Sequence, residues 1–377
     1  MYLRQLDVHG LRNLQSVKLS PGPRINTICG PNGSGKTSLL EAIYLLGRGR
    51  SFRTRTLKSI INTQTDACTV FGLVCREETL SGGDGALRRD VPVGVSRTRS
   101  GGFHFKLDGE RVYASSVLAQ ALPLLLLNND SFQLLEGGPQ GRRQFLDWGV
   151  FHVEHDFKEI WRRLTRCLQH RNSLLRHDRI DPAEIALWDA QFIELSERVT
   201  VERKRYLDAL APRISQVLQR LSPVKDLHFR FQCGWDERLS LAEVLVKDRQ
   251  RDRQGRVTHH GPHRADLKIL CGNQAAAEVL SRGQSKALVT AMLLAQGQLY
   301  FEATGRTCVY LLDDLPAELD RGHRQAVAVF LGEMQAQAFI TGTDEAELLS
   351  LWPGPEIGDG NIGQTVFHVE QGVVCGV

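Results

Sequence analysis

The residues with the clearest chemical meaning lie at positions 30–37, where GPNGSGKT matches the pattern G-x-x-x-x-G-K-[ST] throughout. A strand-like segment, residues 25–29, precedes this motif, and a segment with helical spacing, residues 38–46, follows it. In such a loop, backbone N–H groups curve around phosphate oxygens, the lysine reaches the β and γ oxygens, and the threonine can bind Mg²⁺. This context disfavours a glycine-rich turn that only opens a helix. The predicted nucleotide-binding residues are Gly30, Asn32, Gly33, Ser34, Gly35, Lys36, Thr37 and Ser38.

Two neighbouring acids can supply the carboxylates that a P-loop needs for its metal ion. Asp313 and Asp314 directly follow the apolar segment 308–312, which is typical of a strand. Asp313 is predicted to hold Mg²⁺ through water, and Asp314 to orient or activate the attacking water. The alternative, two acids that only cap a strand end, loses weight once the P-loop is considered. The sequence therefore predicts ATP and Mg²⁺ as cofactors, Thr37 and Asp313 as metal ligands, and Lys36 and Asp314 as catalytic residues.

The segment LSRGQ, residues 280–284, opens a predicted helix about thirty residues before these acids. Alone it would usually be an N-cap turn, but the order of motifs is that of an ABC-type ATPase. A serine hydroxyl and a glycine N–H at a helix N-terminus form an anion site. Because one molecule cannot place two such sites on the same γ-phosphate, we expect Ser281, Gly283 and Gln284 to contact nucleotide bound to a partner subunit. An ATP-dependent homodimer follows, with residues 318–320 crossing between subunits.

A basic run after the predicted P-loop helix is the first candidate for DNA contact. Arginine contacts to phosphate supply affinity without reading sequence. The alternative is that some of these side chains line the nucleotide site or form a solvated surface. The run consists of Arg48, Arg50, Arg53, Arg55 and Lys58, interleaved with Phe52.

Other basic residues have weaker claims. Arg142 and Arg143 are a second DNA candidate, balanced by a structural salt-bridge role. The runs at 162–166 and 203–205 are expected to be only the solvated face of a helix. For His263 and Arg264 we expect a structural or dimer-contact role, not catalysis.

Bulk properties point to an ordinary globular protein. The formal net charge is only +4, so DNA binding has to rest on local clusters. The N-terminus shows no secretory pattern, and the longest apolar run, near residues 121–127, is too short for a membrane span. The eight cysteines form no metal-like spacing, which favours buried, reduced thiols. We expect a cytoplasmic protein without a membrane partner.

The elements around these motifs change character along the chain. Residues 67–112 are predicted to form short strands with a hairpin at 105–112, and residues 81–85 a mobile loop. Residues 154–220 are nearly glycine-free and helical, with Asp181 as the N-cap of a long amphipathic helix. Residues 247–256 are predicted to be a charged linker or exposed loop. Strands and helices then alternate, which indicates an α/β architecture.

Several segments together resemble the RecF family over essentially the full length. They are LDVHGLRNLQ, GPNGSGKTSLLEAIYLL, GRSFRT, GGPQGRRQFLDW, GPHRADL, LSRGQ and LLDDLPAELD. The resemblance implies an α/β fold: an ABC/SMC-like P-loop ATPase head with an inserted helical domain and no long coiled coil. Residues 1–150 would form the N-terminal part of the ATPase core, 151–257 the helical arm, and 258–377 the C-terminal part of the core with the signature and the acid pair.

The resemblance also implies a function. The family's role is ATP-dependent DNA binding in recombinational repair and replication-gap processing, on single- and double-stranded DNA and at gap junctions. RecO- and RecR-type proteins are the implied partners in loading RecA. Weak, DNA-stimulated ATP hydrolysis by an ATP-closed homodimer is implied as well.

The chain departs from the general ABC pattern in two places. Thr-Gly-Thr at 341–343 stands where a switch histidine is usual, and Asp314 stands where transport-type ATPases carry glutamate. Both differences predict slow hydrolysis. The Q-loop position stays open among Asn129, Asp130 and Gln133.

Two other functional classes fit the chain less well. In the ATP-hydrolysing subunit of a transporter, the P-loop and signature lie much closer than the roughly 245 residues between Lys36 and Ser281. A structural SMC-type protein would need a longer coiled coil than the helical segment provides.

Overall fold

The computed structural model describes residues 1–377 except 55, 80–85, 180, 353–362 and 377. It separates into two compact units. The head unit contains Met1–Ser131, Arg220–Ser222 and Tyr300–Val377; the helical unit contains Phe132–Gln219 and Pro223–Leu299. These bounds differ from the segments expected from the sequence, because the helical unit begins before residue 151 and extends past 257 to include the signature segment.

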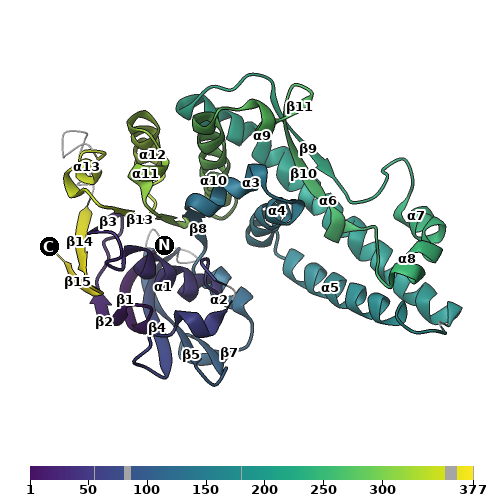
Figure 1. The fold of residues 1–377 in the computed structure, drawn as a ribbon, viewed down its shortest axis with the longest axis horizontal. Helices are drawn as coiled ribbons and strands as arrows, with labels where there is room; N and C mark the ends of the chain where they lie inside the picture. The colour runs from purple at the N-terminus through teal and green to yellow at the C-terminus, as the bar shows by residue number, and fades with distance from the viewer. Residues whose placement is uncertain (55, 80–85, 180, 353–362, 377) are drawn as a thin grey trace. The chain divides into compact units, whose positions relative to one another are not determined.

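A mostly parallel six-stranded sheet organises the head unit (Figure 1). Its order is β15-β14-β3-β13-β12-β8, and only the β14–β15 pair is antiparallel. β3, β12 and β13 are buried at every position, as expected for central parallel strands. The predicted strands before the P-loop and before the acid pair are thus confirmed. The strand bounds are β3 Ile25–Cys29, β8 Leu124–Leu127, β12 Val309–Leu312, β13 Ala338–Gly342, β14 Gln364–Glu370 and β15 Val373–Gly376.

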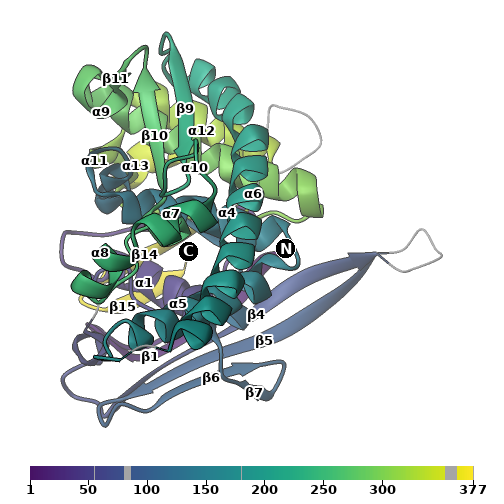
Figure 2. The same ribbon diagram turned by 90° about the vertical axis from the view of Figure 1, so that its right-hand side faces the viewer.

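An antiparallel sheet of order β2-β1-β4-β5-β6-β7 completes the β structure of the head unit. Figure 2 shows β4 and β5 running side by side as the longest pair. The prediction of short strands here is wrong, because β4 and β5 have 13 residues each, whereas the predicted hairpin at 105–112 is confirmed as β6–β7. The predicted mobile loop at 81–85 lies outside the described residues. The strand bounds are β1 Tyr2–Leu11, β2 Leu14–Leu19, β4 Ala67–Thr79, β5 Ala86–Thr98, β6 Phe103–Leu107 and β7 Glu110–Val112.

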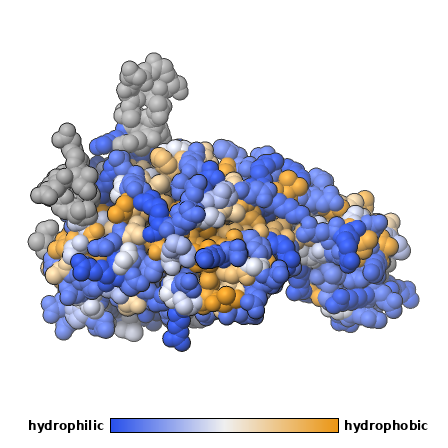
Figure 3. All heavy atoms as spheres, turned by 90° about the horizontal axis from the view of Figure 1, so that it is seen from above, coloured by the Kyte–Doolittle hydropathy of each residue, from blue (hydrophilic) through white to orange (hydrophobic). Residues whose placement is uncertain are grey.

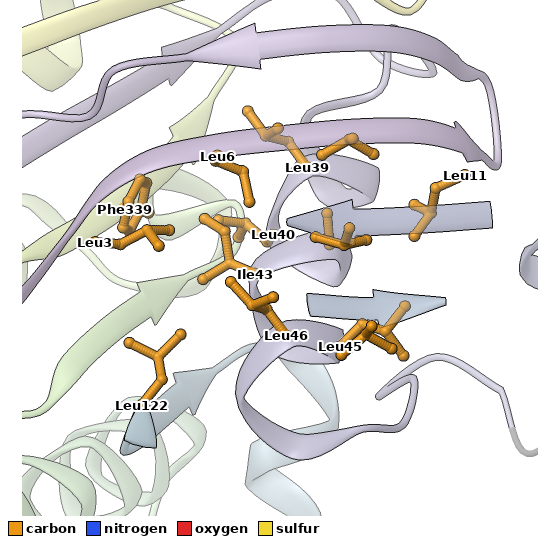
Figure 4. Packing of buried hydrophobic residues seen from close by; sticks show 14 of the residues in the cluster. Leu3, Leu6, Leu11, Leu39, Leu40, Ile43, Leu45, Leu46, Leu122 and Phe339 are labelled. Carbon is orange, nitrogen blue, oxygen red and sulfur yellow. The ribbon is translucent and has the colours of Figure 1, made fainter. Parts of the chain in front are cut away.

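Helix α1, Lys36–Arg48, lies between the two sheets and supplies the centre of the core (Figure 4). Its apolar residues include Leu40 and Ile43, which belong to one buried cluster with Leu6 of β1 and Phe339 of β13. Burial of each such side chain contributes about 1.5–3 kcal/mol. The core therefore fixes the P-loop helix against both sheets. The other helices of the head unit are α2 Ser115–Ala121, α11 Leu315–Glu318, α12 Arg321–Glu333 and α13 Glu345–Leu349, with a 3-10 turn η1 at Leu57–Ile60. A second 3-10 turn, η2 at Asn129–Phe132, includes the boundary between the two units along the chain.

The helical unit is built on the 40-residue helix α6, Pro182–Leu221. Its predicted cap is confirmed: the Asp181 carboxylate accepts a hydrogen bond from the N–H of Ala183 at 2.9 Å. The predicted linker at 247–256 is wrong, because α7 ends there and α8 follows almost at once. The bounds are α3 Gln133–Glu136, α4 Pro139–Val153, α5 Phe157–Leu174, β9 Leu227–Gln232, α7 Leu241–Lys247, α8 Arg249–Gly255, η3 Pro262–Arg264, β10 Asp266–Cys271, β11 Gln274–Ala275, α9 Ala276–Val279 and α10 Arg282–Thr304, whose end enters the head unit.

Buried ion pairs, not only apolar contacts, hold the helical unit together. Arg171 of α5 is fully buried and contacts Asp189 at 2.7 Å and Asp252 at 2.8 Å. Arg203 of α6 is also fully buried and makes a two-point contact with Asp147 at 2.8 and 2.9 Å. The expectation that the run at 203–205 is a solvated face is therefore wrong for Arg203. Breaking such pairs is strongly destabilising, because it leaves an uncompensated buried charge.

The surface is mainly hydrophilic on the face shown in Figure 3, with apolar residues scattered among polar ones. Within the described part of the chain, no helix combines the length and apolarity needed to cross a membrane. Most cysteines are buried as expected, but Cys271 is half-buried and Cys375 is exposed, which corrects the prediction for these two.

Candidate nucleotide site

The candidate site forms where three parallel strands end at the same edge of the sheet. The P-loop follows β3, Asp313 follows β12, and Thr341 lies near the end of β13. Because β13 pairs with both β3 and β12, Thr341 lies between the P-loop and the acids. The carboxyl edge of an open α/β sheet is the usual place for a ligand.

The P-loop adopts a conformation that requires glycine. Gly30 has φ +156°, and a Cβ there would lie 2.1 Å from the carbonyl oxygen of Val369. Gly35 has φ +124°, and its Cβ would meet the Asn13 amide at 2.9 Å. The Lys36 ammonium lies inside the loop and donates to the carbonyls of Gly30 at 2.7 Å and Pro31 at 3.0 Å. Burial lowers the pKa of Lys36, and the nearby Asp314 and Asp313 oppose that shift.

Asp313 joins the P-loop helix to the neighbouring strand. Its Oδ1 accepts hydrogen bonds from the hydroxyls of Thr37 at 3.0 Å and Thr341 at 2.8 Å. Burial raises the pKa of Asp313, and the bonds from Thr341 and Thr37 act against that increase. The pair predicted from the sequence to bind metal, Thr37 and Asp313, is therefore brought into direct contact. A threonine hydroxyl beside a carboxylate fits the oxygen preference of Mg²⁺.

Asp314 differs from its neighbour in exposure and backbone. Its φ of +50° is left-handed, and its side chain is exposed. The N–H of Asp314 donates to the Thr341 hydroxyl at 2.7 Å, which fixes this turn. Both residues line the pocket, with Asp314 exposed and Asp313 half-buried.

Two functional candidates, Arg12 and Asn13, were missed by the sequence reasoning, and Thr341 was noted only as standing where a switch histidine is usual. The Asn13 amide donates to the Ser34 carbonyl at 2.8 Å and accepts from the Ser38 hydroxyl at 3.0 Å. Arg12 makes a two-point contact, 2.9 Å on each side, with the fully buried Glu41 of α1. Arg12 and Asn13 both belong to the segment LDVHGLRNLQ that resembles the RecF family, but nothing in its spacing ties it to the P-loop.

These groups enclose one pocket of about 490 Å³. Its lining combines backbone N–H donors, one ammonium, two guanidinium groups and two carboxylates, which suits a polyphosphate with a bound cation. Of the residues predicted from the sequence, Asn32, Gly33, Gly35, Lys36, Thr37, Ser38, Arg53, Asp313 and Asp314 line it, together with Arg12, Asn13, Ser59, Ile61, Thr63 and Thr341. Gly30 and Ser34 shape the loop behind it, and the Ser34 hydroxyl is buried without a hydrogen-bond partner in the described structure.

Comparisons with known proteins agree with this architecture. The family described as RecF/RecN/SMC N terminal domain matches residues 2–350. The chain is 46% identical over 375 residues to the DNA replication and repair protein RecF of Cellvibrio japonicus, covering 99% of both chains. It is 47% identical over 373 residues to the protein of the same name from Chromohalobacter salexigens, again covering 99% of both. The chain belongs to the RecF family.

Solved structures show the same fold. A structure described as the recombination mediator protein RecF-ATP in the RecFOR pathway matches with a TM-score of 0.84 at 25% identity, covering 100% of this chain and 97% of that one. An Smc head bound to the C-winged helix domain of ScpA matches with a TM-score of 0.58 at 16% identity, covering 100% and 97%. This RecF-family chain thus has the ABC/SMC-like ATPase head fold expected from its motifs.

The signature segment lies in the helical unit, at the start of α10. Ser281 is exposed and forms a reciprocal cap with Gln284: its N–H donates to the Gln284 side chain at 3.0 Å, and its hydroxyl accepts from the Gln284 N–H at 3.3 Å. Gly283 is exposed as well. This N-cap leaves the first turn of α10 open to solvent. In the head unit, Asp320 of the predicted subunit-crossing segment caps α12 through the His323 N–H at 3.0 Å.

The structure separates the members of the predicted DNA-binding run. Arg53 lines the nucleotide pocket and lies 3.7 Å from Glu41, which favours the alternative that it serves the nucleotide site. Arg48 is half-buried and hydrogen-bonds Tyr44. Arg50 and Lys58 are exposed, and Arg55 lies outside the described residues.

The other basic candidates and the open Q-loop position are placed as follows. Arg142 is buried and contacts Asp266 at 2.8 Å, and Arg143 donates to the Ala265 carbonyl at 2.7 Å, so both have structural roles.

Burial lowers the pKa of His263 to about 4, and its Nε2 lies 3.0 Å from the Thr258 carbonyl oxygen. The three Q-loop candidates, Asn129, Asp130 and Gln133, are all exposed, and none of them lines the nucleotide pocket.

Proposed function

We propose that this RecF-family chain is an ATP-dependent DNA-binding protein of recombinational repair and replication-gap processing. The observation that carries the proposal is the contact of Thr37, Asp313 and Thr341 beneath a P-loop whose pocket can hold a polyphosphate. The relatives named above are DNA replication and repair proteins, and one structural relative was solved with ATP.

The residues of the head unit divide the work on the nucleotide. Lys36 and the loop N–H groups bind the phosphates, while Arg12 and Arg53 add positive charge along the pocket. Thr37 and Asp313 would hold Mg²⁺, which neutralises charge on the β- and γ-phosphates when it is bound. The exposed carboxylate of Asp314 orients the attacking water. Because Asp314 is shorter than glutamate and residues 341–343 contain no histidine, we propose that ATP hydrolysis is weak, and from the resemblance to the family that DNA stimulates it.

Dimerisation is the second part of the proposal. Ser281, Gly283 and Gln284 expose a helix N-terminus, which favours a bound anion. We propose that this N-terminus contacts the γ-phosphate held by a second copy of the chain, so that ATP closes a homodimer. Residues 318–320 would cross between the subunits.

DNA and protein partners complete the proposal. The ATP-closed dimer would bind single- and double-stranded DNA, including gap junctions, with Arg50 and Lys58 as exposed phosphate contacts. RecO- and RecR-type proteins would be the partners in loading RecA, in keeping with a structural relative assigned to the RecFOR pathway. A cytoplasmic location is proposed on the same grounds.

Two measurements test the proposal. Light scattering with a non-hydrolysable ATP analogue and Mg²⁺ should show dimers, and mobility shifts should show DNA binding that the analogue strengthens. Lys36→Ala should weaken nucleotide binding and dimerisation together, whereas the control Lys18→Ala, an exposed change on β2, should affect neither. Unchanged nucleotide affinity in Lys36→Ala, or DNA binding that ignores nucleotide without any dimer, would contradict the proposal.

A further inference from the structure

A second pocket, of about 1010 Å³, lies entirely within the helical unit. Strand β9 and the turn after it contribute Arg230 and Trp235, α8 contributes Arg251, and the loop at residues 258–265 contributes His260 and Arg264. The pocket therefore gathers three guanidinium groups, imidazole and an indole from three separate parts of the chain. The remaining lining residues are Phe231, Gln232, Gly234, Asp236, Glu237 and His259.

The acids of the lining are engaged elsewhere. Asp236 is paired with Arg238 at 2.8 Å, and Glu237 with Lys204 at 2.7 Å. Among the described residues, the guanidinium groups of Arg230 and Arg264 have no hydrogen-bonding or ion-pairing partner, although both side chains are exposed and border the pocket. Two uncompensated cations thus face one cavity.

The imidazoles in the pocket wall are held by carboxylates. His259 Nδ1 lies 2.8 Å from Asp252, and His260 Nε2 lies 2.6 Å from Asp248. Arg251 lies 3.7 Å from the same Asp248. These contacts hold the two rings in the wall of the pocket.

The loop that carries Arg264 is held rigidly from behind. Three arginines donate to it at 2.7 Å: Arg171 to the Thr258 hydroxyl, Arg203 to the Pro262 carbonyl and Arg143 to the Ala265 carbonyl. Arg171 and Arg203 are fully buried and need their carboxylate partners to be stable there. These interactions hold the backbone of residues 258–265 and therefore the place from which the Arg264 side chain extends.

The two walls meet backbone to backbone at a pair of glycines. The Gly261 N–H donates to the Gly234 carbonyl at 3.2 Å. A Cβ on Gly234 would lie 2.2 Å from the Gly261 carbonyl oxygen, and both residues have left-handed φ, +99° and +134°. The close approach brings the turn that carries Trp235 against the loop that carries Arg264.

We propose that this pocket binds the sugar-phosphate backbone of a nucleic acid, with Arg230 and Arg264 on phosphodiester oxygens and Trp235 beside a base. Planar guanidinium groups match phosphate geometry, and preorganisation lowers the entropy lost on binding. An indole offers a stacking surface that every base can use. The inference adds a nucleic-acid contact in the helical unit and rests on the proposed DNA binding.

The test compares two double variants of the full chain in the presence of a non-hydrolysable ATP analogue and Mg²⁺. Arg230→Ala/Arg264→Ala removes the two unpaired charges of the pocket. Arg163→Ala/Arg166→Ala removes two exposed charges from α5 of the same unit, outside the pocket. Fluorescence anisotropy with a labelled single-stranded oligonucleotide is measured over a range of salt concentrations.

The pocket variant should lose affinity, and its salt slope should fall by about 1.4, because each neutralised phosphate contributes about 0.7 on single strands. The control should keep the wild-type slope. Arg230→Lys/Arg264→Lys should recover part of the slope, and all variants should keep wild-type nucleotide affinity and unfolding temperature. Ultraviolet cross-linking should place the oligonucleotide on a peptide that contains Trp235.

Other results would overturn the inference. An equal slope change in both Arg→Ala variants would assign the effect to net charge, and no change in either would remove the pocket from DNA binding. Polyglutamate provides a further test, because it offers carboxylates without bases. If it displaces the oligonucleotide from the control variant but not from the pocket variant, and no cross-link forms at Trp235, the pocket binds an acidic peptide. If the wild-type chain binds no DNA under any nucleotide condition, the proposed function fails, whereas loss of the pocket effect alone leaves that function intact.

Discussion

Asp314 presents an exposed carboxylate at the rim of the nucleotide pocket from a left-handed backbone position. Asparagine is among the residues that tolerate this conformation best, so Asp314→Asn should preserve the turn. We expect nucleotide binding to be unchanged, hydrolysis to fall by about 100-fold, the scale of a lost general base, and the ATP-bound dimer to persist longer. Single-turnover ATP hydrolysis and the decay of the dimer in light scattering measure the two effects.

The matched control for this change is Asp66→Asn. Asp66 is also an exposed acid of the head unit, but it does not line the pocket. A normal turnover rate in Asp314→Asn, or an equal loss in both variants, would remove Asp314 from catalysis.

Glu41 is the second residue with a sharp expectation, because its buried carboxylate accepts from Arg12 on both oxygens and from the Ser51 hydroxyl. Glu41→Gln keeps the volume but removes the charge that compensates Arg12. We expect the free energy of unfolding to fall by about 2 kcal/mol, the scale of a hydrogen bond to a charged group. Nucleotide affinity should fall too, because Arg12 and Arg53 both line the pocket and both lie near Glu41.

Asp90→Asn provides the comparison for Glu41→Gln. Asp90 pairs with Arg4 in the same unit at 2.7 Å, but this pair is far more exposed. Its loss should lower the free energy of unfolding by less than about 1 kcal/mol and leave nucleotide affinity unchanged. Urea unfolding separates the two variants, and equal effects would show that burial of Glu41 has no special role.

At the scale of elements, the sequence predicted the parts whose signals are local. The β3–P-loop–α1 unit, the strand before Asp313 and the cap of α6 each depend on a few neighbouring residues, and each is confirmed. Elements that depend on distant partners were missed. The charged segment 247–256 lacks apolar periodicity, yet α8 is held there because Asp252 is buried against Arg171 and His259.

The candidate site shows the same difference between residues with local sequence signals and residues placed by distant contacts. Lys36, Thr37 and Asp313 belong to motifs and were predicted, whereas Arg12 and Asn13 reach the pocket from the β1–β2 turn of the other sheet, and the bond from Thr341 to Asp313 depends on the order of strands. Thr341 is placed there because β13 lies between β3 and β12, a crossover that no short pattern encodes. Similarly, the burial of Arg203 depends on Asp147, which lies 56 residues away along the chain.

The loop at residues 258–265 should make stability depend on pH. Burial lowers the pKa of His263 to about 4, so below pH 6.5 the unfolded chain binds a proton that the folded chain does not. The free energy of unfolding should therefore fall as pH decreases from about 6.5 toward 4, by roughly 2 kcal/mol at pH 5 for this group. His263→Asn should reduce this pH dependence, measured by urea unfolding at pH 7 and pH 5.

His155→Asn is the control for this titration, because His155 is an exposed histidine of the same unit. It should leave the difference between pH 7 and pH 5 unchanged. If His263→Asn and the wild type lose equal stability over this range, the buried imidazole is not the group responsible.

At the scale of the whole molecule, the P-loop belongs to the head unit and the signature segment to the helical unit, so the proposed dimer depends on both. Ser281→Arg places a bulky side chain at the exposed N-terminus of α10, where the partner's nucleotide would bind. It should abolish ATP-dependent dimers in light scattering while a monomer still binds nucleotide.

Ser240→Arg is the matched control, because Ser240 is likewise an exposed serine in a reciprocal cap with a residue three positions later. Both changes remove an N-cap worth about 1 kcal/mol, so any loss of stability should be shared. Normal dimers in Ser281→Arg would exclude this helix end from the interface, and an equal loss in both variants would show that only stability had been lost.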